Sequence, residues 1–233
     1  MLKINSQYLN PVILIPARLE SSRFPAKPLA LLNNKPMVSM VYDKCVASGF
    51  DTFVVTDSRK VAHCIPYEHI VYTGDAFNGT ERCKLALQDS KLMQYDTIIN
   101  VQGDMPDITP DIIHSVYNCL KQGWDIATAY TEMPEHLLSD PNSVKLIHNR
   151  SYAFWFGRGT NYGSHHLGVY GYTRDILKHY PKQESEHEKI EKLEQLRWLD
   201  SGTTIGVTRV DFQGIEINTP EDVDRWHANN ATS

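Results

Sequence analysis

Short apolar runs alternate in the first half of the chain with longer segments whose apolar residues recur at helical spacing. The strand-like runs cover residues 12–15, 52–56, 69–72, 97–101 and 125–130. The helix-like segments cover residues 37–48, 58–64, 80–90 and 110–122. Strands that alternate with helices in this way are typical of βαβ units, so the pattern predicts an α/β fold with a Rossmann-like, mostly parallel sheet.

The pattern changes in the second half of the chain. Three β-like runs cover residues 144–147, 152–156 and 167–172, and a charged segment with helical periodicity, residues 185–200, precedes a last strand at 203–210. We therefore predict one domain over residues 1–233, with a smaller β-rich lobe inserted at about 131–200. Thr219-Pro220 predicts a helix start near the C-terminus, since threonine caps helices and proline fits their first turn.

The overall charge argues against several classes of function. The chain has 23 basic and 28 acidic residues and a formal net charge of -5, so it has no global field that would attract nucleic acid or an anionic membrane. No apolar run approaches the roughly 20 residues that span a bilayer, and the N-terminus lacks the order of a signal peptide. We expect a cytoplasmic protein that binds neither nucleic acid nor membranes, and any anion site to be local.

One local cluster of cations follows the first predicted strand. The stretch IPARLESSRFPAKP, residues 15–28, contains Arg18, Arg23 and Lys27 among prolines that stiffen the loop. In an open parallel sheet, ligands bind beyond the carboxyl ends of the strands, where this loop begins. Such a loop suits the phosphates of a nucleotide, although a merely solvated basic loop has the same composition. No Walker motif and no Gly-x-Gly-x-x-Gly follows the first strand, which argues against dinucleotide binding.

A carboxylate follows another predicted strand in the stretch TIINVQGDMPD. Asp104 stands directly after the strand at 97–101 and Gln102-Gly103. Because Mg²⁺ in proteins usually takes one or two carboxylates together with phosphate oxygens, Asp104 is a candidate magnesium ligand. Taken alone, an aspartate with a glycine just before it and a proline two positions after it is also typical of a turn.

Eight sequence blocks together resemble one protein family. They are IPARLESSRFPAKPL, VVTDSRKVA, NGTER, NVQGDMP, DPNSVKLI, HLGVYGY, EKLEQLR and NTPEDVDR, and they occur in the order and approximate spacing of CMP-Kdo synthetase, or 3-deoxy-manno-octulosonate cytidylyltransferase. The resemblance implies a sugar-nucleotidyltransferase fold and a homodimer that uses CTP and Mg²⁺. It also implies a 3-deoxy-ulosonic acid as acceptor, with a CMP-sugar for lipopolysaccharide or capsule as the product.

The resemblance also implies roles for individual residues. Arg18, Lys27 and Asp104 match phosphate-binding and metal-binding positions with a catalytic role, and Asn218 matches a second metal position. Further nucleotide contacts are implied for Ser22, Arg23, Thr56, Thr80 and Gln102. Sugar contacts are implied for Arg158, His166, Tyr170, Glu194 and Gln195.

Plainer interpretations exist for the residues on the sugar side. His165 and His166 could simply be polar residues beside the apolar strand at 167–172. The spacing of three residues along the series Glu188, Glu191, Glu194 and Arg197 could be the solvated face of one helix. Only the resemblance turns Glu194 and Gln195 into sugar contacts.

The chain departs from the family pattern at three places. Asn218 stands where the family usually has an aspartate that binds magnesium, which would weaken a second metal site. The segment 157–166 is shorter than usual, which leaves the identity of the sugar and the usual dimer contact open. Asn78 replaces the usual serine before Gly79.

These departures leave three functional hypotheses. The first is a cytidylyltransferase acting on Kdo or a close relative such as the 8-amino analogue. The second is a CMP-nonulosonate synthetase, which acts on sialic-type acids by the same chemistry. The third is a homologue that binds CTP without turnover, which the loss of charge at Asn218 would favour.

Overall fold

The structure is a computed structural model that describes residues 9–20 and 24–231. The chain divides into two compact units. The N-terminal unit comprises residues 12–93, 100–110 and 213 onwards, and the central unit comprises residues up to 11, 94–99 and 111–212. Strand β6 (Thr97–Val101) contributes residues to both.

The sheet of the N-terminal unit is parallel. Its strand order is β6, β1 (Pro11–Pro16), β4 (Asp51–Thr56) and β5 (Ile70–Tyr72). Both β1–β4 and β4–β5 pair in parallel. The side chains of residues 12–15 are completely buried, which explains why β1 reads as an unbroken apolar run. These pairings confirm the predicted parallel arrangement.

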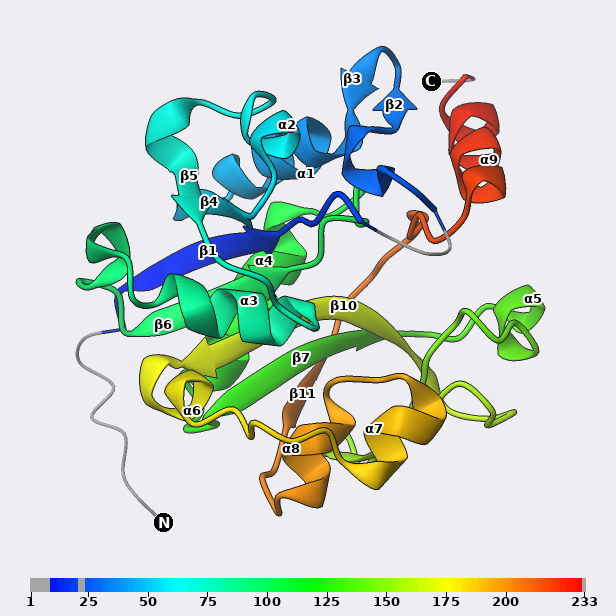
Figure 1. Cartoon of the computed structure of the whole chain (residues 1–233). Coiled ribbons are helices and arrows are strands. Elements are labelled where there is room, and N and C mark those ends of the chain that lie inside the picture. The colour runs from blue at the N-terminus through cyan, green and yellow to red at the C-terminus, as the bar shows by residue number, and fades with distance from the viewer. Residues whose placement is uncertain (1–8, 21–23, 232–233) are drawn as a thin grey trace. The chain divides into compact units, whose positions relative to one another are not determined.

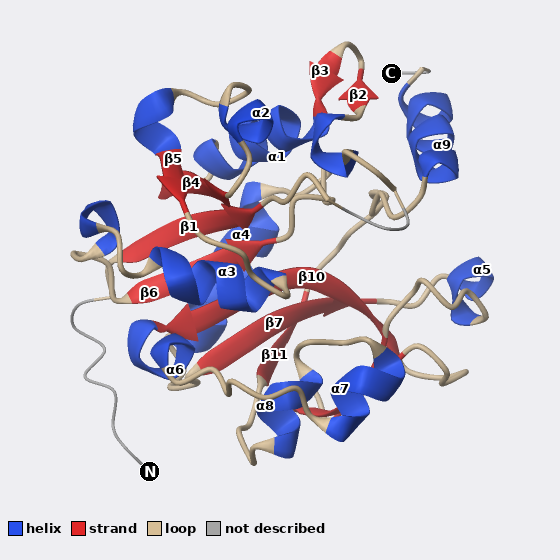
Figure 2. Cartoon of the chain, viewed as in Figure 1, coloured by secondary structure: helices blue, strands red, loops and turns tan. Residues whose placement is uncertain are grey.

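Helices and short turns connect these strands, and α1 packs beside β4 (Figure 1). The α-helices are α1 (Met37–Val46), α2 (Arg59–Ala62), α3 (Gly79–Ala86) and α9 (Pro220–Asn230). The 3-10 helices are η1 (Lys27–Leu29), η2 (Tyr67–His69) and η3 (Ser90–Leu92). A small hairpin, β2 (Leu31–Leu32) with β3 (Lys35–Pro36), lies near α9 (Figure 2), where His227 Nε2 is 3.2 Å from the Leu31 carbonyl oxygen.

The central unit has a mixed sheet. Its strand order is β11 (Gly206–Arg209), β7 (Ile126–Thr131), β10 (Ser164–Thr173) and β6. Strand β11 is parallel to β7, and β10 is antiparallel to β7. Strands β8 (Lys145–His148) and β9 (Ala153–Gly157) form an antiparallel pair, and β8 also pairs with β10. The long strand β10 falls within the residues of the predicted lobe.

Five helices accompany this sheet in the described part of the chain. They are α4 (Pro110–Leu120), α5 (Glu135–Leu138), α6 (Arg174–Lys178), α7 (Glu186–Glu191) and α8 (Leu196–Asp200). Gly171 of β10 marks a close approach to α4, since a Cβ atom there would lie 2.7 Å from Leu120 Cδ1. None of the helices in the described residues combines the length and apolar character that crossing a bilayer needs.

The single helix predicted over residues 185–200 is wrong. The chain forms α7 and α8 instead, and Lys192 ends α7 with a left-handed backbone, φ 56°. The physical reason is an ion pair between Glu188 and Arg197, nine positions apart. In one straight helix these residues would be separated by roughly 13 Å along the axis, so they meet only because the helix breaks between them.

Candidate functional site

One cation of the first loop, Lys27, meets Asp104 in the N-terminal unit. Lys27, at the start of η1, donates from Nζ to Asp104 Oδ2 at 2.6 Å and to the Ile217 carbonyl oxygen at 2.8 Å. Their side chains remain 18% and 25% exposed, so both groups are still accessible from solvent. The predicted juxtaposition of the basic loop and Asp104 is therefore confirmed for Lys27.

Close backbone contacts bring these groups together. A Cβ atom on Gly103 would lie 3.3 Å from the Pro16 carbonyl oxygen, so the end of β1 approaches the turn after β6 closely. The Ile217 backbone N–H donates to the Asp104 carbonyl oxygen at 2.9 Å. Asn218, the second predicted metal position, directly follows Ile217 in the sequence, so its backbone lies close to that of Asp104.

The segment that carries Asn218 is held by carboxylates. Asp222 Oδ2 accepts the backbone N–H groups of Asn218 and Thr219 at 2.7 and 2.8 Å, which fixes the start of α9 as the sequence predicts. Further upstream, Asp107 Oδ2 accepts the Ile215 N–H at 2.9 Å. The backbone around Asn218 is therefore well fixed even though its side chain carries no charge.

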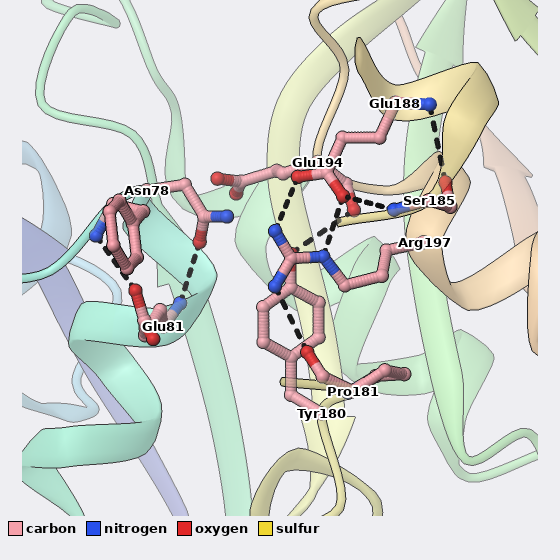
Figure 3. Close-up of polar contacts among 9 residues, drawn as sticks. Asn78, Glu81, Tyr180, Pro181, Ser185, Glu188, Glu194 and Arg197 are labelled. Carbon is pink, nitrogen blue, oxygen red and sulfur yellow. Dashed lines mark hydrogen bonds and ion pairs between the residues drawn. The ribbon is translucent and has the colours of Figure 1, made fainter. Parts of the chain in front are cut away.

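Arg18 lies beside the start of α3. Its Nη1 donates to the Phe77 carbonyl oxygen at 3.4 Å. The next residue, Asn78, caps α3 by accepting the Glu81 backbone N–H at 2.8 Å (Figure 3). Asparagine caps helices as well as serine does, so the departure from the family at this position preserves the local structure.

Three of the remaining predicted nucleotide contacts, Thr56, Thr80 and Gln102, lie in the described residues. Gly79 allows Gln102 to come very close, because a Cβ atom there would lie 2.8 Å from Gln102 Nε2. Thr56 and Thr80 are buried, and the Thr56 hydroxyl accepts the Ser58 backbone N–H at 3.1 Å. Ser22 and Arg23 lie outside the described residues.

The oxygen ligands near Lys27 fit a magnesium ion that arrives with a phosphate chain. Among the described residues, no group of three or more His, Cys, Asp or Glu side chains could hold a metal. Asp104 would supply one carboxylate, and Asn218, which follows the Ile217 that contacts the Asp104 backbone, would supply an amide oxygen. Mg²⁺ commonly binds one or two protein carboxylates and completes its shell with phosphates and water, so this set suits it.

In the central unit, β10 brings His166 and Tyr170 together, with ring centroids 5.3 Å apart. His166 Nε2 lies 3.0 Å from the Thr128 hydroxyl, which itself donates to the Val169 carbonyl oxygen at 2.7 Å. His166 must therefore donate from Nε2, and its Nδ1 is the acceptor nitrogen. Burial lowers the pKa of His166 to about 3, with His165 and Arg158 adding to the effect, so the ring is neutral.

Arg158, another predicted sugar contact, is tied to a neighbouring loop. Its Nη1 donates to the Asn142 carbonyl oxygen at 2.6 Å, and its backbone N–H donates to Glu191 Oε2 at 2.7 Å. Lys145, which is almost fully buried, donates to the Arg158 carbonyl oxygen at 3.2 Å. Burial lowers the pKa of Lys145, although three backbone carbonyls accept from its ammonium group.

Ring contacts connect β10 to α8, which begins directly after Glu194 and Gln195. Tyr170 lies 6.0 Å from Tyr172, and Tyr172 lies 6.2 Å from Trp198 of α8, measured between ring centroids. Gln195, the N-cap of α8, is buried, and Glu194 is partly exposed. The sugar-side residues of β10 and α8 thus belong to one packed region of the central unit.

The solvated helix face suggested by periodicity is wrong for Glu188 and Arg197. Both are buried and form a bidentate ion pair. Likewise, His165 and His166 are buried in β10 rather than being polar residues at its edge. Sequence spacing missed the Arg197 contacts, because they depend on the turn at Lys192.

Comparison with known proteins shows the family to which the chain belongs. The sequence model of a family described as cytidylyltransferase matches residues 12–205. The chain is 37% identical to 8-amino-3,8-dideoxy-manno-octulosonate cytidylyltransferase of Shewanella halifaxensis, over 92% of this chain and 96% of that protein. It is 35% identical to 3-deoxy-manno-octulosonate cytidylyltransferase of Acaryochloris marina, over 92% of this chain and 95% of that protein.

A solved structure gives the same indication. The fold is similar to that of CMP:2-keto-3-deoxy-manno-octonic acid synthetase complexed with CTP, with a TM-score of 0.84 and 29% identity. The alignment covers 96% of this chain and 99% of that one.

Proposed function

Because this chain belongs to the cytidylyltransferase family, we propose that it transfers CMP from CTP to a 3-deoxy-octulosonic acid and releases pyrophosphate. The observation that carries the proposal is the contact of Lys27 with Asp104 and the Ile217 carbonyl. It joins a cation from the loop after β1 and a carboxylate from the turn after β6, which are 77 positions apart in the sequence. Such an arrangement suits a phosphate chain that carries its own metal ion.

On the nucleotide side, the protein acts by positioning and by neutralising charge. Arg18 and Lys27 would donate charge-assisted hydrogen bonds to phosphate oxygens. The sugar hydroxyl would form a bond to the α-phosphorus and lose its proton, while the bond from that phosphorus to the leaving pyrophosphate breaks. Reactions of this kind depend mainly on alignment and on compensation of the charge on the phosphates.

We propose that Asp104 and Asn218 hold Mg²⁺ together with the phosphates of CTP. When bound, the ion would add positive charge against the phosphates. Asp104 accepts from Lys27, so the carboxylate would be shared between the ammonium group and the ion, and Lys27 would donate to a phosphate oxygen beside it. The neutral Asn218 would contribute only a weak ligand.

On the sugar side, the donors and acceptors suit a ligand rich in hydroxyls. His166 offers Nδ1 as an acceptor, and Glu194 with Gln195 offers both acceptors and donors. Arg158 adds a positive charge that would pair with the carboxylate of an ulosonic acid. These roles follow from the family resemblance together with the chemistry of the groups.

The proposal does not specify whether the sugar carries an amino group or a hydroxyl group at C8. Relatives with either name, the 8-amino sugar or the 8-hydroxy sugar, match this chain almost equally well. Purified protein with CTP and Mg²⁺ should be offered Kdo, 8-amino-Kdo and a sialic-type acid in parallel. We expect pyrophosphate release with at least one octulosonate, and mass spectrometry to identify its CMP adduct.

The other outcomes separate the competing hypotheses. A CMP adduct formed only with the sialic-type acid would replace the proposal by CMP-nonulosonate synthesis. CTP binding without pyrophosphate release from any acid would favour a homologue without turnover. The homodimer expected from the resemblance stays a prediction, which the molar mass in solution from light scattering would test.

A further inference from the structure

The α7–α8 region contains a buried ion pair that cannot reach a ligand directly. Arg197 donates from Nε and Nη2 to the two carboxylate oxygens of Glu188, each at 2.6 Å (Figure 3). Its Nη1 donates to the Pro181 carbonyl oxygen at 2.9 Å. The Arg197 and Glu188 side chains are only 2% and 6% exposed, so any effect on a substrate must be indirect.

Stability alone is a poor explanation for this pair. The loss of hydration on burying two charges is large, and apolar residues of similar volume are often as stabilising or more so. A bidentate pair does provide fixed geometry, because the planar guanidinium holds the carboxylate in one orientation. The question is therefore which part of the molecule this geometry fixes.

Several contacts around the pair lead to the turn between α7 and α8, whereas the Pro181 carbonyl and the Ser185 backbone N–H, which donates to Glu188 Oε2 at 3.3 Å, tie the pair to the segment before α7. The Arg197 guanidinium lies 4.6 Å from the centre of the Tyr180 ring, and the Tyr180 hydroxyl donates to the Glu194 carbonyl oxygen at 3.3 Å (Figure 3). The Arg197 backbone N–H donates to the same carbonyl oxygen at 3.3 Å. Before the turn, the Lys192 N–H donates to the Glu188 carbonyl oxygen at 2.7 Å.

We propose that Tyr180, Glu188 and Arg197, here called the Arg197 cluster, are positioning residues that hold Glu194 and Gln195 for the acceptor sugar. The cluster fixes residues on both sides of the left-handed Lys192 and binds the carbonyl of Glu194 directly. This inference rests on the proposed function, because it assumes that Glu194 and Gln195 contact the sugar. It assigns the selectivity for the sugar partly to side chains that never touch it.

Tyr180→Phe is the most conservative test, because it removes the hydroxyl and keeps the ring over Arg197. We expect the KM for the octulosonate to rise about fivefold, the effect of one ordinary hydrogen bond, with little change in the KM for CTP. Tyr117→Phe is the matched control. It removes a hydroxyl that donates to the Leu9 carbonyl oxygen, away from α7 and α8, and should leave both KM values unchanged.

The double variant Glu188→Met, Arg197→Met separates positioning from stability. Because both charges are removed together, no unpaired ion is left and the fold should persist. We expect the KM for the sugar to rise at least tenfold while the KM for CTP stays within about twofold of the parent. A double variant with parental KM for the sugar, or with equal rises in both KM values, would overturn the proposal.

Hydrogen exchange gives a second measurement that needs no turnover. In Tyr180→Phe, backbone amides of residues 192–198 should exchange faster than in the parent or in Tyr117→Phe. Unchanged exchange there would show that the cluster does not fix the turn. If the parent protein forms no CMP-sugar at all, the proposed function fails, and the exchange experiment still decides whether the cluster holds Glu194 and Gln195.

Discussion

The two sets of candidate residues use their charges differently. In the N-terminal unit, Lys27 and Asp104 form an ion pair that solvent still reaches. In the central unit, the Glu188–Arg197 pair is buried, and His166 is buried and neutral. One region keeps its charges available, and the other uses buried charges and rings to hold neutral or partly exposed groups.

The difference follows from the ligands that we propose for each region. A phosphate chain with its metal brings its own charge, so the protein needs counter-charges that can exchange partners. A sugar offers many hydroxyls of similar chemistry, and these are distinguished by the placement of donors and acceptors. Positioning residues are therefore more valuable on the sugar side, and accessible charges on the nucleotide side.

The largest effect should come from the accessible carboxylate. Asp104→Asn should lower CMP-sugar formation about a hundredfold, since loss of one well-placed electrostatic group in a reaction centre costs on the order of 3 kcal/mol. Steady-state pyrophosphate release at saturating CTP and Mg²⁺ measures it, and circular dichroism checks the fold. Asp111→Asn, at an exposed position on α4, is the matched control. Near-parental turnover of Asp104→Asn would remove Asp104 from the reaction.

A smaller and more selective effect is expected on the sugar side. Glu194→Ala combined with Gln195→Ala should raise the KM for the octulosonate at least tenfold, because two hydrogen-bonding groups are lost at roughly 1 kcal/mol each. The KM for CTP should change much less. Glu186→Ala, on the exposed surface of α7, should change neither value. Equal losses for both substrates would argue against the separation of the two regions.

The smallest effect concerns stability and the buried histidines of β10. Burial lowers the pKa of His165 to about 4 and that of His166 to about 3. In the unfolded chain these histidines bind protons near pH 6.5. Their contribution to the free energy of unfolding is therefore fully present above that pH and is lost as the pH falls toward 4. Each histidine should contribute up to about 1.4 kcal/mol per pH unit to the slope.

Urea unfolding at several pH values between 7 and 4.5 measures that slope. Because other groups also titrate, the informative quantity is the difference between the parent and His166→Gln. We expect the free energy of unfolding of the variant to depend less steeply on pH, by the amount that one titrating histidine contributes. This difference does not depend on the stability of the variant at pH 7. Identical slopes would mean that His166 is not buried as a neutral ring.

Much of the nucleotide side could be predicted from short contiguous stretches. The apolar run of β1 and the cations that follow it are adjacent in the sequence, and strand ends in a parallel sheet gather at one edge. That rule was enough to predict that the basic loop and Asp104 meet. It could not indicate that Lys27 would also bind the Ile217 carbonyl, because that contact joins positions 190 residues apart through a backbone group that any residue type offers.

On the sugar side, spacing was misleading. Residues 185–200 have the composition and periodicity of one helix, and local propensity cannot indicate a break at a lysine. The break occurs because Lys192 adopts a left-handed backbone and Glu188 folds back onto Arg197. With this break in the helix, Arg197 is interpreted as a buried positioning residue and no longer as a solvated charge.

By itself, the sequence determined the α/β architecture, the end of the sheet where the charges gather and the family to which the chain belongs. These depend on local patterns and on contiguous motifs, which survive without knowledge of distant contacts. Only the tertiary structure decided which charges stay accessible and which are buried in pairs. Burial and pairing depend on groups that the fold brings together from separate segments. Contact between such groups removes water from a side chain and thereby changes its charge state.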